Sequence, residues 1–377
     1  MKTEKHPTHL TYCLNVHPGE SWAENFEAIK TNALAVRERI SPDRPFGLGL
    51  RFCNAAAETL SEEDNINEFK RFLEENNLYV FTVNAFPYGA FHGKRVKENV
   101  YLPDWRSNER VAYTKLVVDI LSQLLPEGVS GSVSTVPGAY KKSVGLDSDK
   151  TLIVKNLMDC ASYLDHLYKT RGKDICLGLE PEPDCLFENT QETIDFFAGL
   201  SADRGGRHLG VCFDTCHMAV QFENISDSLE KLVEAGIRIS KVQLSSAVKA
   251  MGLKENIDQL KKFDDKTYLH QVRVRKTDGE QESWPDLPEA LEEGVSGEYS
   301  DAEWRIHCHV PLYFESHEGI YSTADELTPE FFKNLAAKNI DHIEIETYTF
   351  NVLPEEIRNR DIVQSIVEEY KWVRERL

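Results

Sequence analysis

Four short apolar segments of this chain end in a side chain that could bind a metal ion or transfer a proton. These side chains are Glu180, Asp214, Gln243 and Glu346. Apolar runs of this length are typical of strands buried in a parallel sheet, and side chains at the carboxyl ends of barrel strands converge on a ligand. Asp214 and His217 alone would also fit a helix-capping aspartate beside a core histidine. Because the pattern recurs on other strands, we predict a shared site.

Three carboxylates that converge without a counterion repel one another, and each would have a raised pKa. A divalent cation removes this repulsion, and ligands rich in oxygen suit Mn²⁺, Mg²⁺ or Zn²⁺. A lysine or arginine could neutralise the same cluster instead. We favour one divalent metal ion, and the alternative stays open.

The segments that position these residues alternate between strands and helices. Strands are predicted at 11–16, 46–52, 79–83, 131–138, 175–183, 210–214, 240–246 and 342–347. Helices are predicted at 22–40, 61–73, 110–125, about 150–168, 190–200, 226–235 and 354–377. Ser21 and Glu24 form a capping box at the start of the first helix. Eight strands with intervening helices and no hairpin turn predict an α/β fold, a (β/α)8 TIM barrel.

The region from about 254 to 314 is longer than one helix and two loops require. Residues 268–275 and 304–310 alternate like half-exposed strands, and the acidic segment 278–301 between them is expected to be a flexible tip. We interpret the region as a β-ribbon inserted between the seventh and eighth barrel strands, over the mouth of the barrel. A separate domain is less favoured, because we expect too few apolar residues for a core of its own. The prediction is therefore one domain, residues 1–377.

Composition limits the class of partner. The formal net charge of −20 argues against binding to a nucleic-acid backbone as the main role. No stretch approaches 18 uncharged apolar residues, so membrane insertion is not expected and a cytoplasmic location is. The eight cysteines, several in buried-type strands, are expected to be reduced thiols.

Three motifs resemble those of known enzymes. Leu179-Glu-Pro-Glu-Pro183 is similar to the fifth-strand ligand motif of xylose isomerase, and the segment 210–217 is similar to the sixth-strand motif of endonuclease IV. Ile345-Glu-Thr347 matches the Leu-Glu-Thr pattern of the eighth strand. The chain thus resembles the xylose isomerase-like TIM barrels, which include sugar isomerases, ketose 3-epimerases and endonuclease IV. Its whole pattern, with the loop that starts at Asn84 and the long insertion, is most similar to the EboE family of metabolite-traffic proteins.

The resemblance implies a metal site and a pair of catalytic groups. The epimerases bind one metal with Glu, Asp, His and Glu, which correspond here to Glu180, Asp214, Gln243 and Glu346. An amide oxygen at position 243 would bind the metal more weakly than an imidazole. Glu180 and Glu346 correspond to the acid and base on opposite faces of the substrate carbon.

The resemblance also implies a second, zinc-type site. The third zinc of endonuclease IV uses positions that correspond to His217, His307 and His309. The histidines of the first zinc align with Asn84 and Val136, so that metal is expected to be absent, which counts against DNA repair. His307 and His309 share one face of an alternating strand, where they could also be surface residues.

Further residues are candidates for contact with a small-molecule substrate. They are Asn84, Phe86, Tyr88, Phe91, His92, Lys94 and Glu182. The aromatic members of this set could equally serve in packing.

Two functions remain open after the sequence analysis. The first is a metal-dependent isomerase or epimerase that acts next to a carbonyl or hydroxyl group of a small sugar-like or polyol-like metabolite. The second is a barrel that binds a metabolite or a partner protein and has lost turnover. The EboE resemblance implies a place in a metabolite processing or trafficking pathway and partner proteins from the same gene cluster.

Overall fold

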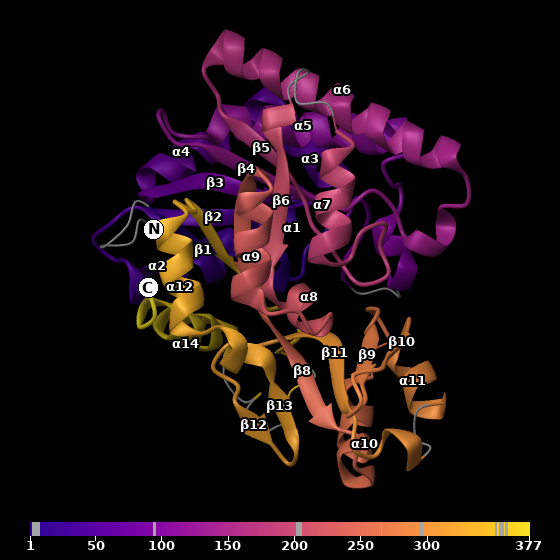
Figure 1. Ribbon diagram of the computed structural model, residues 1–377. Coiled ribbons are helices and arrows are strands. Elements are labelled where there is room, and N and C mark those ends of the chain that lie inside the picture. Colours follow the sequence, from indigo (N-terminus) through magenta and orange to yellow (C-terminus); the bar gives the residue numbers. More distant parts are fainter. Residues whose placement is uncertain are drawn as a thin grey trace.

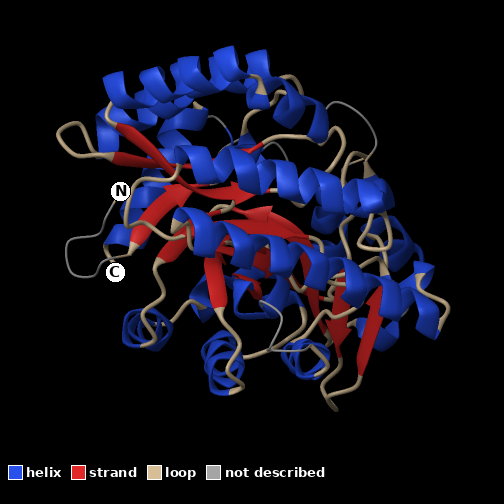
Figure 2. Cartoon of the chain, turned by 90° about the horizontal axis from the view of Figure 1, so that it is seen from above, coloured by secondary structure: helices blue, strands red, loops and turns tan. Residues whose placement is uncertain are grey.

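The computed structural model describes residues 1, 8–92, 96–200, 206–264, 266–293, 297–350, 353, 358 and 361–377. Within these ranges an eight-stranded parallel sheet has the order β1-β14-β7-β6-β5-β4-β3-β2. Cys13, directly after β1, forms a parallel bridge with Gly49 of β2 and joins the two edges of the sheet. Helices surround the strands (Figure 2). The predicted (β/α)8 barrel is confirmed.

The eight barrel strands lie close to the predicted ranges. Their bounds are β1 His9–Tyr12, β2 Phe46–Arg51, β3 Leu78–Asn84, β4 Gly131–Thr135, β5 Ile175–Leu179, β6 Leu209–Asp214, β7 Ile239–Leu244 and β14 His342–Ile345. Nearly all of their residues are buried on both faces, as expected of parallel strands covered by helices.

The helices of the barrel differ more from prediction. Their bounds are α1 Trp22–Ala28, α2 Leu34–Ile40, α3 Asn54–Ser61, α4 Glu63–Glu75, α5 Asn108–Leu124, α6 Asp147–Arg171, α7 Thr190–Ala198, α8 Thr215–Val220, α9 Ile225–Glu234, α12 Pro329–Ala337 and α14 Ile362–Arg374. The predicted capping box at Ser21 and Glu24 is present. A π-helical turn, Ile29–Ala33, joins α1 to α2. Ser61 ends α3, a helix that the sequence analysis missed, rather than opening the next one.

The region between β7 and α12 forms a second sheet that projects from one end of the barrel (Figure 1). Its order is β10-β9-β11-β8-β13-β12. The strands are β8 Ser246–Met251, β9 Val272–Arg275, β10 Gln281–Trp284, β11 Glu303–Val310, β12 Ser316–His317 and β13 Ile320–Ser322, and the helices are α10 Lys254–Leu260 and α11 Leu287–Glu293. The insertion is therefore wider than 254–314, and the predicted ribbon strands belong to a six-stranded antiparallel sheet.

This second sheet has its own apolar cluster, so the expectation of too few apolar residues was wrong. Antiparallel register places Val248 opposite Ile306 and Ile306 opposite Val272. Alternate residues of three strands thus share a face and bury one another. The predicted tip contributes as well, because Trp284 of β10 stacks on Trp304 with ring centroids 6.0 Å apart. The assignment of residues 1–377 to one domain stays a prediction.

A charged pair lies inside the barrel, one layer below the strand ends. The Lys241 ammonium binds the Glu344 carboxylate, and both side chains are fully buried. Gly49 makes room for this carboxylate, because a Cβ atom there would lie 2.2 Å from Glu344 Oε1. The barrel interior is therefore built around a salt bridge as well as apolar residues.

Within the described part of the chain, no helix combines the length and the apolar character needed to cross a membrane.

The buried salt bridge leads to a stability prediction. Replacing Lys241 by Met leaves the Glu344 carboxylate buried without its partner, which should lower the free energy of unfolding by about 3–5 kcal/mol. The double variant Lys241→Met/Glu344→Gln should recover most of this loss, because no unpaired charge remains. Urea unfolding of the three proteins measures both effects. The matched control is Lys249→Met, whose partner Asp325 is largely exposed, with an expected cost below about 1 kcal/mol. Equal losses at both lysines would contradict the prediction.

Candidate active site

The predicted strand-end residues converge at one end of the barrel. Glu180 directly follows β5, Asp214 is the last residue of β6, and Glu346 follows β14 by one position. One oxygen atom from each of these three carboxylates lies within 4.8 Å of the other two. The three side chains are buried. They are thus close enough to share one cation.

Two of the carboxylates, Asp214 and Glu346, are oriented through one of their oxygens. Glu346 Oε1 accepts hydrogen bonds from Asn15 Nδ2 and Asn84 Nδ2, both at 2.9 Å. Asp214 caps α8, and its Oδ1 accepts from the backbone N–H groups of Cys216 (2.7 Å) and His217 (3.1 Å) and from Ser245 Oγ (2.7 Å). These donors hold the carboxylates in place without neutralising them.

The other oxygens are left for a ligand. Among the described residues, Glu180 Oε2, Asp214 Oδ2 and Glu346 Oε2 are buried without a hydrogen-bond partner. A buried acceptor without a partner costs free energy, and a divalent cation would satisfy all three at once. This donor set of carboxylate oxygens fits Mn²⁺, Mg²⁺ or Zn²⁺.

The electrostatics of the three carboxylates differ. Burial, and then the nearby Asp214, raises the pKa of Glu180 well above its usual value. Burial, and then Glu180 and Asp214, does the same to the pKa of Glu346. Burial opposes ionisation of Asp214 too, but His217, His309 and the Ser245 hydrogen bond keep its pKa below the usual value. Asp214 is therefore the carboxylate that stays ionised most readily.

Gln243 lies beside the cluster with its amide turned to a cysteine. It is fully buried and is the register partner of Asp214 on the neighbouring strand. Its Oε1 accepts a hydrogen bond from Cys212 Sγ at 3.0 Å, and its Nε2 has no partner among the described residues. In this orientation the amide oxygen is engaged by the thiol.

The three predicted zinc-site histidines meet in a buried group. The ring centroids of His217 and His307 are 4.6 Å apart, those of His217 and His309 are 5.4 Å apart, and those of His307 and His309 are 5.1 Å apart. His217 comes from α8, whereas His307 and His309 project from β11 of the second sheet. The insertion thus reaches into the barrel mouth and supplies part of the site.

Backbone and amide acceptors fix the protonation of these rings. His217 Nδ1 lies 2.8 Å from the Pro181 carbonyl oxygen, and His309 Nδ1 lies 2.9 Å from the Glu346 carbonyl oxygen. A carbonyl can only accept, so both Nδ1 atoms carry the proton. In the neutral ring, Nε2 then presents a lone pair, which is the form in which histidine binds metals.

A pocket lies directly over these groups. Its volume is about 60 Å³, which is small for a ligand site. Its walls are formed by Asn15, Asn84, Phe86, Pro87, Phe91, Val96, Lys97, Val100, Tyr101, Glu180, Glu182, His217, Tyr268, Leu269, His307, His309, Glu346 and Tyr348. The floor is thus acidic and the sides are largely apolar and aromatic.

The candidate substrate contacts divide into two groups. Asn84, Phe86, Phe91 and Glu182 line the pocket. Tyr88 is not among the lining residues and packs edge-on against Tyr113. His92 is not among the lining residues either and donates from Nε2 to the Asn15 carbonyl oxygen at 2.8 Å. Lys94 is outside the described residues.

Several site residues were missed from the sequence. Asn15 follows β1 but was included in the predicted strand, and Tyr101 belongs to a short 3-10 helix that no apolar pattern marks. Gln271 lies just before β9 and hydrogen-bonds His307 Nδ1 at 2.7 Å. An Asn near the end of the first predicted strand was the one available signal.

Comparison with known proteins identifies the type of barrel. A family model described as "Xylose isomerase-like TIM barrel" matches residues 48–294, more than half of the chain. A comparison with curated proteins found no match.

Three solved structures share the fold at low sequence identity. An L-ribulose 3-epimerase is 11% identical with a TM-score of 0.53, covering 98% of this chain and 94% of its own. The probable 3-DHS dehydratase AsbF of Bacillus anthracis is 12% identical with a TM-score of 0.51, covering 97% and 98%. The IOLI protein, described with a binding zinc atom, is 13% identical with a TM-score of 0.50, covering 98% of each chain. At this identity the likeness extends to the fold alone.

The pocket geometry predicts a pH effect on stability. Burial raises the pKa of Glu182 to about 8, although the Tyr101 hydroxyl donates a hydrogen bond to it. Because this pKa lies above the usual value of 4.5, the folded state binds more protons than the unfolded state between these two values. Stability should therefore fall as pH rises through this window, by about 1.4 kcal/mol per pH unit from this group.

The measurement is urea unfolding at several pH values in metal-free buffer, for the wild type and Glu182→Gln. The variant cannot ionise at this position. Its free energy of unfolding should therefore rise relative to that of the wild type as pH rises. Parallel pH profiles would show that Glu182 is ionised normally.

Proposed function

This chain belongs to the xylose isomerase-like TIM barrel family, and on that premise we propose that it is a metal-dependent isomerase or epimerase. Its substrate is a small sugar-like or polyol-like metabolite, and the reaction moves a proton at a carbon next to a carbonyl or hydroxyl group. The observation that carries the proposal is the set of three buried carboxylates, each with one unpartnered oxygen, on the floor of the pocket. An epimerase among the proteins that share the fold is consistent with this reaction class.

Glu180, Asp214 and Glu346 would hold the ion, with Gln243 as a fourth ligand if its amide turns away from Cys212. The bound ion would supply positive charge that offsets the repulsion among the carboxylates and polarises a substrate oxygen. His217 and His309 also lie within reach of Asp214, which gives an alternative set of ligands for an ion bound to Asp214.

The proton steps belong to the two glutamates with raised pKa values. Glu346 is aimed by the Asn15 and Asn84 amides, and its carboxylate would take a proton from a substrate carbon beside the ion. Glu180, from a strand across the floor, would return a proton on the other side of that carbon. A carboxyl whose pKa approaches the working pH is suited to both tasks. The apolar side walls keep water from competing for the proton.

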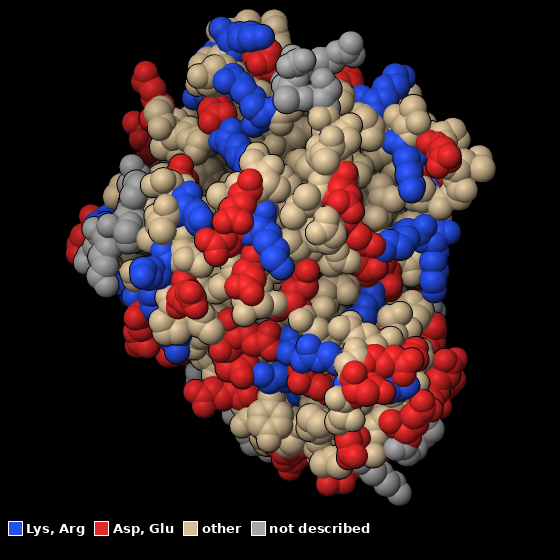
Figure 3. Space-filling model, in the orientation of Figure 1, with Lys and Arg blue, Asp and Glu red and all other residues tan. Residues whose placement is uncertain are grey.

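The finer assignment is also part of this proposal. The motifs support membership of the EboE family, and with it a role in metabolite processing or traffic, a cytoplasmic location and partner proteins from the same gene cluster. Nucleic acid is not a proposed partner, because exposed acidic side chains gather over the second sheet (Figure 3), among them Glu289, Glu292 and Asp301 and the net charge is −20.

A second candidate is a barrel that binds a metabolite without turnover. The observation that favours it is Gln243, whose oxygen faces Cys212 instead of the carboxylates. Under this alternative the pocket is occupied but no proton is exchanged.

A proton-exchange experiment separates the two functions. Glu346→Gln keeps an oxygen ligand and removes the proton acceptor, so solvent-deuterium incorporation into the substrate should fall by a factor on the order of 10² or more. Exchange is measured by mass spectrometry over a panel of ketoses and polyols, at equal metal occupancy of both proteins. The control is Glu223→Gln, a largely buried glutamate that binds Thr190 away from the pocket.

Unchanged exchange in Glu346→Gln would remove this residue from catalysis. No exchange by the wild type over the whole panel would favour the binding protein.

The role of Gln243 can be tested by restoring an imidazole. If position 243 contributes a ligand, Gln243→His should raise the affinity for Mn²⁺ on the order of tenfold. Isothermal titration of chelator-treated wild type and variant measures this. An affinity that stays the same or falls would exclude position 243 from the ligand set.

A further inference from the structure

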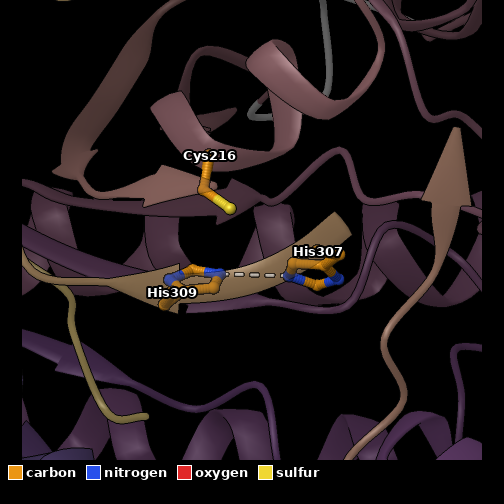
Figure 4. A group of neighbouring side chains, drawn as sticks. All are labelled: Cys216, His307 and His309. Carbon is orange, nitrogen blue, oxygen red and sulfur yellow. Dashed lines mark hydrogen bonds between the residues drawn. The ribbon is translucent and has the colours of Figure 1, made fainter. Parts of the chain in front are cut away.

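We propose that Cys216, His307 and His309 form a separate metal centre for zinc, in which the Cys216 thiolate is a ligand. Figure 4 shows the two imidazole rings on β11, with the thiol of α8 above them. One donor atom of each residue lies within 4.8 Å of the other two, and all three residues are buried. This centre does not depend on the proposed isomerase activity, and either can fail without the other.

The first argument is the arrangement of the histidine pair. His307 Nε2 and His309 Nε2 are 3.0 Å apart. His309 Nδ1 carries a proton because it faces the Glu346 carbonyl oxygen. If His307 Nδ1 also carries one, two lone pairs face each other and repel.

The hydrogen bonds of Gln271 settle the protonation of His307. Gln271 Nε2 lies 3.1 Å from the Pro183 carbonyl oxygen, which can only accept, so this atom is the amide nitrogen. The other amide atom, Oε1, is therefore the one 2.7 Å from His307 Nδ1 and accepts its proton. When both rings are neutral, both Nε2 atoms thus present lone pairs at close range, and a proton or a metal ion between them removes the repulsion.

The spacing of the two nitrogens fits zinc. Zinc–nitrogen bonds of 2.0–2.1 Å in a tetrahedral site put two ligand nitrogens about 3.3 Å apart. The observed 3.0 Å between the Nε2 atoms is close to this value. The Nδ1–H groups donate to oxygen acceptors, as metal-bound histidines commonly do.

The third ligand comes from the turn that follows β6. The Cys216 backbone N–H is held by Asp214 Oδ1 at 2.7 Å and Ser245 Oγ at 3.1 Å, which fixes the position of its side chain. The Cys308 backbone N–H donates to the Cys216 sulfur. This donor lies where the pairing of β11 with β8 is irregular, between Ile306 and Val310. Burial, and then the nearby Asp214, raises the pKa of Cys216 well above its usual value, and the Cys308 hydrogen bond opposes this only in part. The thiolate would therefore form on binding of the metal ion.

The donor set distinguishes this centre from the carboxylate site. A thiolate and two imidazoles select zinc over magnesium or manganese, whereas three carboxylates suit the harder ions. His307 and His309 also line the pocket, so the fourth position of a tetrahedral ion would be open to the pocket, as in catalytic zinc sites.

A competing ligand set shares His309. Asp214, His217 and His309 also lie within 4.8 Å of one another, but Asp214 is part of the carboxylate site. The two sets differ in whether sulfur binds the ion, and that difference can be measured.

The experiment loads the full-length, chelator-treated protein with Co²⁺ alone and records its absorption spectrum. A thiolate ligand produces a strong near-ultraviolet charge-transfer band, which carboxylate and imidazole ligands do not produce. The wild type should show this band, and Cys216→Ser should lose it together with more than about tenfold of its zinc affinity. Cys308→Ala is the matched control: its side chain lies on the opposite face of β11, the backbone donor is kept, and the band should remain.

Three results would overturn the proposal. They are the absence of the band in the wild type, its survival in Cys216→Ser, and loss of zinc binding in His217→Ala but not in Cys216→Ser, which would assign the ion to the competing set. X-ray absorption at the zinc edge of the wild type gives a test that does not depend on folding of a variant. One sulfur ligand is expected, and a first shell of nitrogen and oxygen alone would contradict the centre.

Discussion

The concentration of negative charge inside the barrel is the constraint on which the rest of the site depends. Glu180, Asp214, Glu344 and Glu346 are all buried at one end of a single sheet. Lys241 compensates Glu344, and within the described residues the other three form no ion pair. An isolated buried charge is too costly to persist. The surroundings must therefore supply donors, protons or a cation, and each neighbouring element can be understood by which of these it provides.

The compensation is divided between the barrel and the inserted sheet. The barrel provides neutral donors: the Asn15 and Asn84 amides for Glu346, and the start of α8 for Asp214. The inserted sheet provides the imidazoles of His307 and His309. Lone pairs on these rings add no charge of their own, yet they increase the demand for a cation. The carboxylates of the barrel and the imidazoles of the inserted sheet thus favour binding of a cation before any substrate binds.

The parts found from sequence were those with a local signature. The buried strands predicted the barrel, because alternation and strand length can be recognised over a few residues. The position of Glu180 and Asp214 at strand ends predicted the floor of the pocket. The partnership of Lys241 with Glu344 spans 103 positions, and no local pattern indicates which charges will meet. The inserted sheet was underestimated for the same reason: Val248, Val272 and Ile306 form a core only after three distant strands pair.

The first of the two connections between the sheets consists of one residue, Ser245, between β7 and β8. Its hydroxyl donates to Asp214 Oδ1 and its backbone N–H donates to Thr215 Oγ1. Swinging the inserted sheet about this joint would break bonds to the very carboxylate that is expected to hold a cation. Cation binding and the rigidity of this connection are therefore coupled. An ion on Asp214 makes the wall of the pocket more rigid, and a more rigid wall increases the affinity for the ion.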